Sequence, residues 1–183
     1  MGKRVQSKGT LIWFAVCAAG IAGFIIFLIR DGYFLGRWQN KTIVCDLNGD
    51  GTDEVVKLAK RRAVVSRDGV CLWQSDDGWN VENVLVADIN GDGAKELLVL
   101  LWKRGSYGKY LPFWEEENDK EYSQHIFIYQ SVENRIEALW MSSRLKPQVV
   151  SWEITEDNLL HIATDKEEDT VWMWDQWGLE RVR

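Results

Sequence analysis

The sequence predicts an all-β body behind a single N-terminal transmembrane helix. Short apolar runs recur throughout residues 41–183, and turn signals such as NG, DG and GSYG separate them. Apart from residues 10–29, no segment keeps an amphipathic helical period for three turns. The 46% hydrophobic and 27% charged content is that of a folded chain. We therefore expect a cytoplasmic N-terminus at 1–9, a transmembrane helix at 10–29, a linker with the first strand at 30–40, and an extracytoplasmic β domain at 41–183.

The transmembrane prediction rests on the uncharged run TLIWFAVCAAGIAGFIIFLI, residues 10–29. A run of this length, at a rise of about 1.5 Å per residue, matches a hydrocarbon core of about 30 Å. Lys3, Arg4 and Lys8 precede it, so the positive-inside rule places the N-terminus in the cytoplasm. A cleaved signal peptide and a lipid-modified Cys17 are the alternatives, although the run is long for the first and Val16 suits the second poorly.

Small residues recur four apart within this run, at Ala15, Ala19 and Gly23. In a helix they share one face, and small residues at this spacing let two membrane helices approach closely. The face therefore predicts helix packing and a homo-oligomer. The alternative is that Ala and Gly are simply common in such helices.

Charge is distributed unevenly along the chain. Residues 1–30 hold four basic residues and no acidic ones, whereas residues 31–183 hold the other 18 basic residues and all 28 acidic ones. A body this acidic argues against a nucleic-acid partner. It is compatible with cation binding and with solubility.

The cysteines give no disulfide framework. Cys17 lies in the apolar run, which leaves Cys45 and Cys71. These two could pair in an oxidising compartment, and the sequence leaves their pairing open.

The apolar runs of the body read as strands that form repeated units. Leu97–Trp102 is apolar at every position, which is typical of a strand covered on both faces. Units of about four antiparallel strands begin at Asp46 and Asp88, and a third, whose loop lacks glycine, begins near Glu153. The segment 37–45 could add an edge strand that pairs with the C-terminal strands.

Two acidic loops are the candidate metal-binding segments of the sequence. DLNGDGTDE (46–54) and DINGDGAKE (88–96) both run directly into an apolar strand. Ca²⁺ takes about six to eight oxygen ligands from carboxylates, amides and carbonyls. Glycines between the alternating donors allow the sharp turn that points them inward. An EF-hand is excluded, because its twelfth position demands Glu and here holds Lys57 or Val99.

The duplicated loops resemble the calcium loop of the FG-GAP or VCBS repeats found in integrin-like β-propellers. The resemblance implies propeller-like blades, about three in number, which is fewer than the about four to eight that close a ring. It therefore implies an incomplete ring, an assembly of chains, or a different small β fold that carries the same loop. It also implies ligands at positions 1, 3, 5, 7 and 9 of each loop: Asp46, Asn48, Asp50, Thr52 and Glu54, then Asp88, Asn90, Asp92, Ala94 and Glu96.

The alternative is that NGDG is only a turn, because Asn-Gly is a favoured turn dipeptide. A turn does not require the flanking carboxylates twice, however, and carboxylates held close together without a cation repel one another. We therefore expect both loops to bind Ca²⁺, and we expect the ions to fix the structure of the loops and of the strands that follow rather than to act as calcium sensors.

The longest interruption of the strand pattern is residues 101–125. Long loops on rigid scaffolds carry binding, and aromatic residues favour interfaces. The candidates for a binding loop are Tyr107, Tyr110, Phe113, Trp114 and Tyr122. The alternative is a long hairpin whose aromatic side chains pack on the blade. The strand tryptophans should lie in the core, whereas Trp79, Trp114 or Trp177 would better suit sugar stacking.

No catalytic motif is present in the sequence. The only histidines, His125 and His161, lie inside apolar strands, and there is no GxSxG, HExxH or CxxC. We expect a non-catalytic module at the cell surface that binds a protein partner in preference to a glycan. The alternatives are a structural subunit of a membrane assembly and an enzyme, or its accessory, acting on cell-surface polysaccharide.

Overall fold

The computed structural model describes residues 8–30, 36–37, 39–105, 113 and 120–183. The chain divides into two compact units, Met1–Leu35 and Gly36–Arg183. The first unit contains the one helix of the described chain, and the second contains all of its strands.

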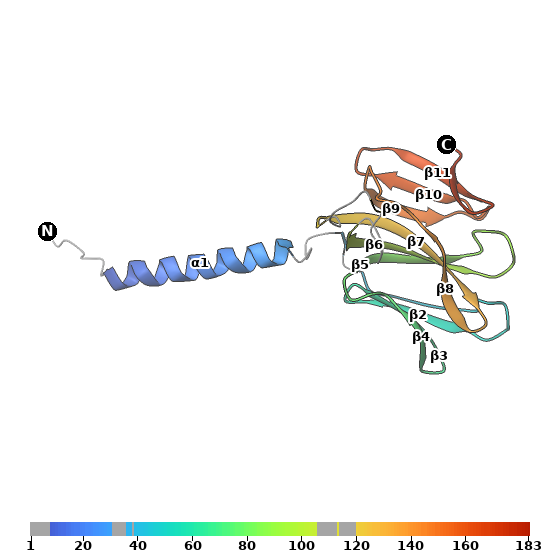
Figure 1. Ribbon diagram of the computed structural model, residues 1–183, viewed down its shortest axis with the longest axis horizontal. Helices are drawn as coiled ribbons and strands as arrows, with labels where there is room; N and C mark the ends of the chain where they lie inside the picture. The colour runs from blue at the N-terminus through green and yellow to red at the C-terminus, as the bar shows by residue number, and fades with distance from the viewer. Residues whose placement is uncertain (1–7, 31–35, 38, 106–112, 114–119) are drawn as a thin grey trace. The chain divides into compact units, whose positions relative to one another are not determined.

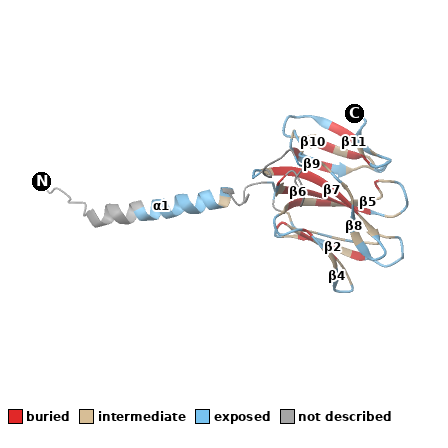
Figure 2. Cartoon of the chain, in the orientation of Figure 1, coloured by how far each residue is buried: buried red, intermediate tan, exposed pale blue. Residues whose placement is uncertain are grey.

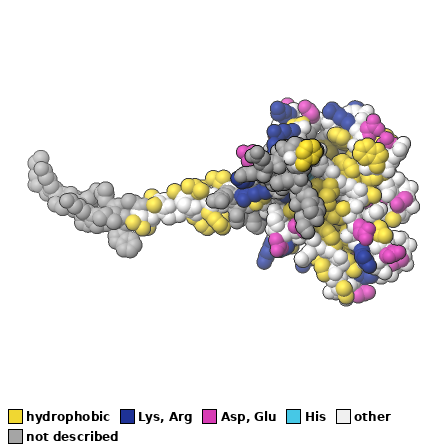
Figure 3. All heavy atoms as spheres, in the orientation of Figure 1, with side chains coloured by type: hydrophobic (Ala, Val, Ile, Leu, Met, Phe, Trp, Pro, Cys, Tyr) yellow, Lys and Arg dark blue, Asp and Glu magenta, His cyan; other side chains and the backbone are white. Residues whose placement is uncertain are grey.

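The helix α1 (Lys8–Arg30) covers the apolar run, which confirms that this run is helical. Its side chains are described from Val16 to Ile29, and the large apolar ones among them are exposed except for Leu28 (Figure 3). Val16, Phe24 and Ile26 are each more than 60% exposed. Over the residues that the structure describes, no helix combines the length and apolar character required to span a bilayer.

The second unit consists of three four-stranded antiparallel sheets (Figure 1). In each sheet the strands are neighbours in chain order. The first sheet contains β1 (Lys41–Cys45), β2 (Glu54–Ala59), β3 (Arg62–Arg67) and β4 (Val70–Gln74). The second contains β5 (Asn80–Ala87), β6 (Glu96–Arg104), β7 (Tyr122–Val132) and β8 (Arg135–Met141). The third contains β9 (Val149–Ile154), β10 (Leu160–Thr164), β11 (Asp169–Asp175) and β12 (Gly178–Arg181).

Tight turns hold the consecutive strands of the first sheet together. Lys60 and Arg61 join β2 to β3, and their φ angles are 50° and 62°. Asp68 and Gly69 join β3 to β4 with φ angles of 50° and 79°. Positive φ at both central residues matches the right-handed twist of the flanking strands. The all-β, four-strand character of the units is therefore confirmed.

The second sheet is the middle layer of a stack (Figure 2). Leu97, Val99 and Leu101 of β6 lie in a core shared with the first sheet, and Leu98 and Leu100 lie in a core shared with the third. None of these five side chains is more than 2% exposed. This confirms the prediction that the continuous apolar run is covered on both faces. The strand tryptophans also lie in or against these cores: Trp73, Trp140, Trp152, Trp172 and Trp174.

Two details of the predicted organisation are wrong. The first strand begins at Lys41, after the predicted linker, and pairs with β2 rather than with the C-terminal strands. The first and second sheets each begin one strand before their acidic loop, because the loop folds the preceding strand back onto the following one. Cys45 is thus opposite Glu54, and Ala87 is opposite Glu96. The three sheets form an open stack, and the described strands form no closed propeller.

The topology also settles the cysteine question within one chain. Cys45 lies on β1 and Cys71 on β4, at opposite edges of the first sheet, and both are free. Three strand spacings of about 4.8 Å separate the two edges. A disulfide requires Cα atoms within about 7 Å. The two thiols therefore do not pair.

Candidate metal site

The two acidic loops repeat one hydrogen-bonding pattern. In the first loop, the Asn48 side chain accepts from the Asp50 backbone N–H at 3.1 Å and donates to the Asp50 carboxylate at 3.0 Å. In the second loop, Asn90 makes the same contacts to Asp92 at 2.9 and 3.0 Å. Asp50 and Asp92 also each accept the backbone N–H two residues further on, at 2.8 Å. The sequence repeat therefore produces a structural repeat at the level of individual atoms.

The glycines take the backbone conformation that the loops require. Gly49 and Gly51 have φ angles of 73° and 84°, and Gly91 and Gly93 have φ angles of 76° and 93°. Side-chain-bearing residues rarely adopt these values. The inferred need for glycine between the oxygen donors is confirmed.

The ninth residue of each loop is a glutamate buried beneath it. Glu54 is 0% exposed and Glu96 is 1% exposed. One oxygen of each accepts a hydrogen bond from the backbone N–H of the second loop residue, Leu47 at 2.8 Å or Ile89 at 3.0 Å. A buried carboxylate requires a charge partner or several donors. The two loops differ in how they meet this requirement.

In the first loop, Arg67 supplies the positive charge. Its Nε donates to the Glu54 carboxylate at 2.6 Å, and its Nη2 donates to the same oxygen. Its Nη1 lies 3.0 Å from the carboxylate of Asp50. The hydrogen bond from Asn48, with the nearby Arg67 charge contributing less, holds the pKa of Asp50 below its usual value.

In the second loop, the corresponding oxygens lack such a partner. One oxygen of Asp46 accepts from the backbone N–H groups of Gly49 and Asp50, whereas the Oδ1 of Asp88 is buried and has no hydrogen-bond partner. Burial raises the pKa of Glu96 to about 7, and the charges of Asp92 and Asp88 act in the same direction. The second loop is thus rich in oxygen atoms, of which those of Glu96 and the Oδ1 of Asp88 are buried while Asp92 is exposed, and no salt bridge neutralises it among the described residues.

The loops are also connected to one another and to the cores. The backbone N–H of Lys95, in the second loop, donates to the Leu47 carbonyl of the first loop at 2.8 Å. Leu47 lies in the core between the first and second sheets, and Ile89 lies in the core between the second and third. Each loop therefore attaches its own sheet to the next one in the stack.

The donor sets differ in how well they fit a hard cation. In the described ranges, no group of three or more His, Cys, Asp or Glu side chains converges on one point, and the loop carboxylates point largely at backbone N–H groups. The second loop nevertheless fits Ca²⁺, because all of its donors are oxygens and the Oδ1 of Asp88 has no partner. The first loop does not fit as it stands, because Arg67 already holds the oxygens of Glu54 and Asp50.

The predicted binding loop connects β6 to β7 and is described only in part. Tyr107, Tyr110 and Trp114 lie outside the described residues. Phe113 is 95% exposed. Tyr122 begins β7, where the Arg104 guanidinium lies 4.5 Å from the centre of its ring. Among the helix-packing candidates, the Ala15 side chain lies outside the described residues, Ala19 is exposed, and nothing lies within 4 Å of a Cβ built on Gly23.

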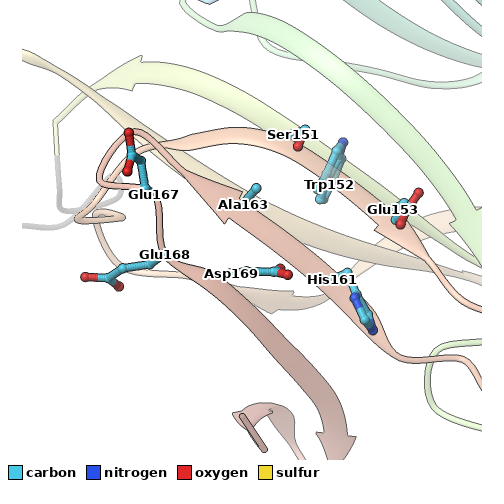
Figure 4. A pocket seen from close by; sticks show the side chains of 8 residues that line it. All are labelled: Ser151, Trp152, Glu153, His161, Ala163, Glu167, Glu168 and Asp169. Atoms are coloured by element: carbon cyan, nitrogen blue, oxygen red, sulfur yellow. The ribbon is translucent and has the colours of Figure 1, made fainter.

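The third sheet carries two hollows that sequence analysis did not predict. One, of about 390 Å³, lies on its outer face (Figure 4). His161 and Glu153 line it from the strands, and Glu168 lines it from the turn between β10 and β11. In the described chain, no hydrogen bond or ion pair joins His161 to a carboxylate or a serine. The other hollow, of about 560 Å³, lies beside Trp177, which is 80% exposed.

Two important residues escaped the sequence analysis. Arg67 gave no signal because its partner Glu54 lies on another strand, and the strand register alone brings them together. Glu82 is 7% exposed and accepts hydrogen bonds from the Trp102 indole at 2.8 Å, the Gln124 amide at 3.2 Å and the Arg37 backbone at 3.2 Å. Gln124 in turn bonds the backbone of Val149, so this cluster connects the second sheet to the third.

The sequence matches no protein-family model, and no curated protein or solved structure is significantly similar to it.

Proposed function

We propose that the chain is a membrane-anchored extracytoplasmic module that binds Ca²⁺ at its second acidic loop and binds its target without catalysis. The observation that carries the proposal is the buried Oδ1 of Asp88, which lacks a hydrogen-bond partner and lies in the same loop as the buried Glu96. The resemblance of both loops to FG-GAP repeats supports it. The ligands would be the side chains of Asp88, Asn90, Asp92 and Glu96 and the carbonyl of Ala94.

The role of the ion is structural. A cation in the second loop would neutralise carboxylates that otherwise repel one another, and it would hold Ile89 in the core between the second and third sheets. An ion that binds only the folded chain stabilises it by mass action. With a dissociation constant of about 10⁻⁴ M, typical of extracellular calcium modules, about 10 mM Ca²⁺ would contribute about 2.7 kcal/mol.

The test is the melting temperature of the full-length protein in mild detergent as Ca²⁺ rises from chelator to about 10 mM. We expect a rise for the wild type that disappears in Asp92→Asn. Asp157→Asn is the matched control, because Asp157 is an exposed acid in a turn of the third sheet. A flat wild-type curve together with no bound metal in elemental analysis would refute calcium binding.

Membrane attachment is supported by the uncharged run at 10–29, the basic residues before it and the exposed apolar side chains of α1. The full-length protein should float with phospholipid vesicles. The double substitution Ile21→Lys and Ile25→Lys should abolish flotation, whereas Val44→Lys, at an exposed apolar position of β1, should not. Flotation unaffected by the helix substitutions would remove α1 as the anchor. Protease digestion of oriented vesicles would test the extracytoplasmic position of the β unit.

A protein is the partner that the segment between β6 and β7 fits best. Its aromatic residues include Phe113, which is 95% exposed, and aromatic residues are enriched at the centre of protein interfaces. The body is too acidic to favour nucleic acid. Deletion of residues 106–119 should abolish capture of the partner and leave the calcium-dependent melting transition unchanged.

A glycan is the second candidate, favoured by the hollow beside Trp177. Its lining combines Trp140 and Trp177 with the charged side chains of Asp175, Glu180 and Arg181. A site that combines aromatic faces with charged groups suits the ring of a sugar. Trp177→Ala should then weaken binding to cell-surface polysaccharide, whereas Val150→Ala, an exposed apolar position in β9, should not.

A further inference from the structure

We infer that Arg67 is the built-in cation of the first acidic loop, so that this loop keeps its shape without metal and the chain takes one Ca²⁺, at the second loop. The inference rests on the proposed function, and it differs from the sequence-based expectation that both loops bind the ion. The duplicated sequence motif therefore contains two chemically different sites.

Arg67 contacts the loop at the positions where an ion would bind. Its guanidinium donates to Glu54, the ninth loop residue, through Nε and Nη2. It pairs with Asp50, the fifth loop residue, through Nη1 at 3.0 Å. The side chain of Arg67 is 17% exposed and that of Glu54 is 0% exposed, so water competes little for the pair.

A guanidinium and a calcium ion exclude each other from this position. Ca²⁺ requires its oxygens at about 2.3–2.6 Å and would need the carboxylates that Arg67 holds. The arginine cannot lose its proton to make room, because its pKa is far above neutrality, and the hydrogen bond to Glu54 raises that pKa further. Displacing the arginine side chain would leave a partly buried charge without its partners, which is costly.

The second loop has a neutral residue in the corresponding place. Val55 pairs with Ser66, so Arg67 lies opposite Glu54 on the neighbouring strand. Leu97 pairs with Tyr129, so the residue opposite Glu96 is Gln130. The strand register therefore identifies Gln130 as the counterpart of Arg67, and an amide carries no charge that would replace the ion.

The orphaned oxygen occurs in the loop that lacks the arginine. The Oδ1 of Asp88 is buried and unpartnered, whereas the matching oxygen of Asp46 accepts two backbone N–H groups at 2.7 and 3.2 Å. The first loop is thus satisfied internally and the second is not. Arg67 also reaches Asn134 in the turn between β7 and β8 at 3.0 Å, which ties the first loop to the second sheet.

Calorimetric titration of the full-length protein in mild detergent with Ca²⁺ alone tests the inference. We expect one site in the wild type, two in Arg67→Gln, and at least a tenfold weaker site in Gln130→Arg. Arg67→Lys, which retains a cation, should keep the single site. In the double variant Arg67→Gln with Gln130→Arg, the single site should move to the first loop and become sensitive to Asp46→Asn instead of Asp88→Asn.

The outcomes separate this inference from the proposed function. No binding by the wild type or by folded Arg67→Gln would refute calcium binding as such. Two wild-type sites, one lost in Asp50→Asn and the other in Asp92→Asn, would support calcium binding and overturn the role of Arg67. One site in both the wild type and Arg67→Gln would also overturn it. If Arg67→Gln fails to fold, unchanged affinity of Gln130→Arg would decide against the inference.

Discussion

His125 is a buried histidine whose surroundings determine its protonation state. It is 1% exposed, and its Nδ1 lies 3.2 Å from the Ser142 carbonyl, which can only accept. The proton is therefore on Nδ1, and Nε2 accepts from the Ser123 hydroxyl at 2.9 Å. Both ring nitrogens are satisfied in the neutral form. Burial lowers the pKa of His125, since a charged ring would be poorly solvated there.

This gives the free energy of unfolding a defined pH dependence. As pH falls below about 6.5, the unfolded chain binds a proton that the folded chain refuses, so stability falls by up to about 1.4 kcal/mol per pH unit. At higher pH both states are neutral and the effect vanishes. Urea unfolding between about pH 5 and pH 7.5 should show this slope in the difference between the wild type and His125→Asn, because the raised pKa of Glu96, which acts in the opposite direction, is common to both. His161→Asn, on the outer face of the third sheet, is the control and should follow the wild type.

A single glycine tests the loop backbone independently of its ligands. Gly93 has a φ of 93° and open space around its absent side chain. Gly93→Ala should destabilise the protein by about 1–2 kcal/mol through backbone strain alone. Gly78→Ala has equal space without the positive φ, so it should leave stability unchanged or raise it by about 0.4–1 kcal/mol. Equal effects of the two substitutions, measured by urea unfolding, would contradict the strain argument.

At the level of elements, β6 is a strand with buried side chains on both of its faces. Leu98 lies in the core with the third sheet and Leu101 in the core with the first, and both are 0% exposed. Each belongs to a different sheet contact, although only two residues separate them. The strand β6 therefore contributes to the packing of the second sheet against the first sheet and also against the third.

Truncation on either face should be equally damaging. We expect Leu98→Ala and Leu101→Ala each to lower the free energy of unfolding by about 2–5 kcal/mol. Val44→Ala, in β1 and 60% exposed, should cost less than about 1 kcal/mol. If either leucine can be truncated as cheaply as Val44, then β6 is covered on one face only and the stacked arrangement is wrong.

At the level of the whole molecule, the sequence could predict what is local and what repeats. The continuous run Leu97–Trp102 indicated a strand covered on both faces, and the spacing of glycines and acids indicated two equivalent loops. The ion pair of Arg67 with Glu54 could not be predicted, because it depends on the register of β2 against β3. That register follows from a turn at Lys60 and Arg61, where positive φ occurs without glycine. The same uncertainty shifted the predicted start of each unit by one strand.

The two acidic loops together account for the order in which the three sheets are stacked. The second residue of the first loop, Leu47, packs between the first and second sheets, and that of the second loop, Ile89, packs between the second and third. The third sheet has a short turn at 155–159 in place of an acidic loop, and no further sheet follows it in the described chain. Each loop thus attaches one pair of neighbouring sheets. Only the contact between the second and third sheets should depend on an ion.

Hydrogen exchange of the full-length protein, with chelator and with Ca²⁺, tests this division directly. Adding Ca²⁺ should slow exchange at Ile89 and in β9 and β10, because the ion would fix Ile89 against the third sheet. Exchange at Leu47 and in β2 and β3 should not change, because Arg67 holds the first loop in both conditions. Arg67→Gln should make the contact between the first and second sheets respond to Ca²⁺ as well. If Ca²⁺ changed the exchange rates at both contacts of the wild type equally, the two loops would be equivalent, and binding of a single ion at the second loop would be wrong.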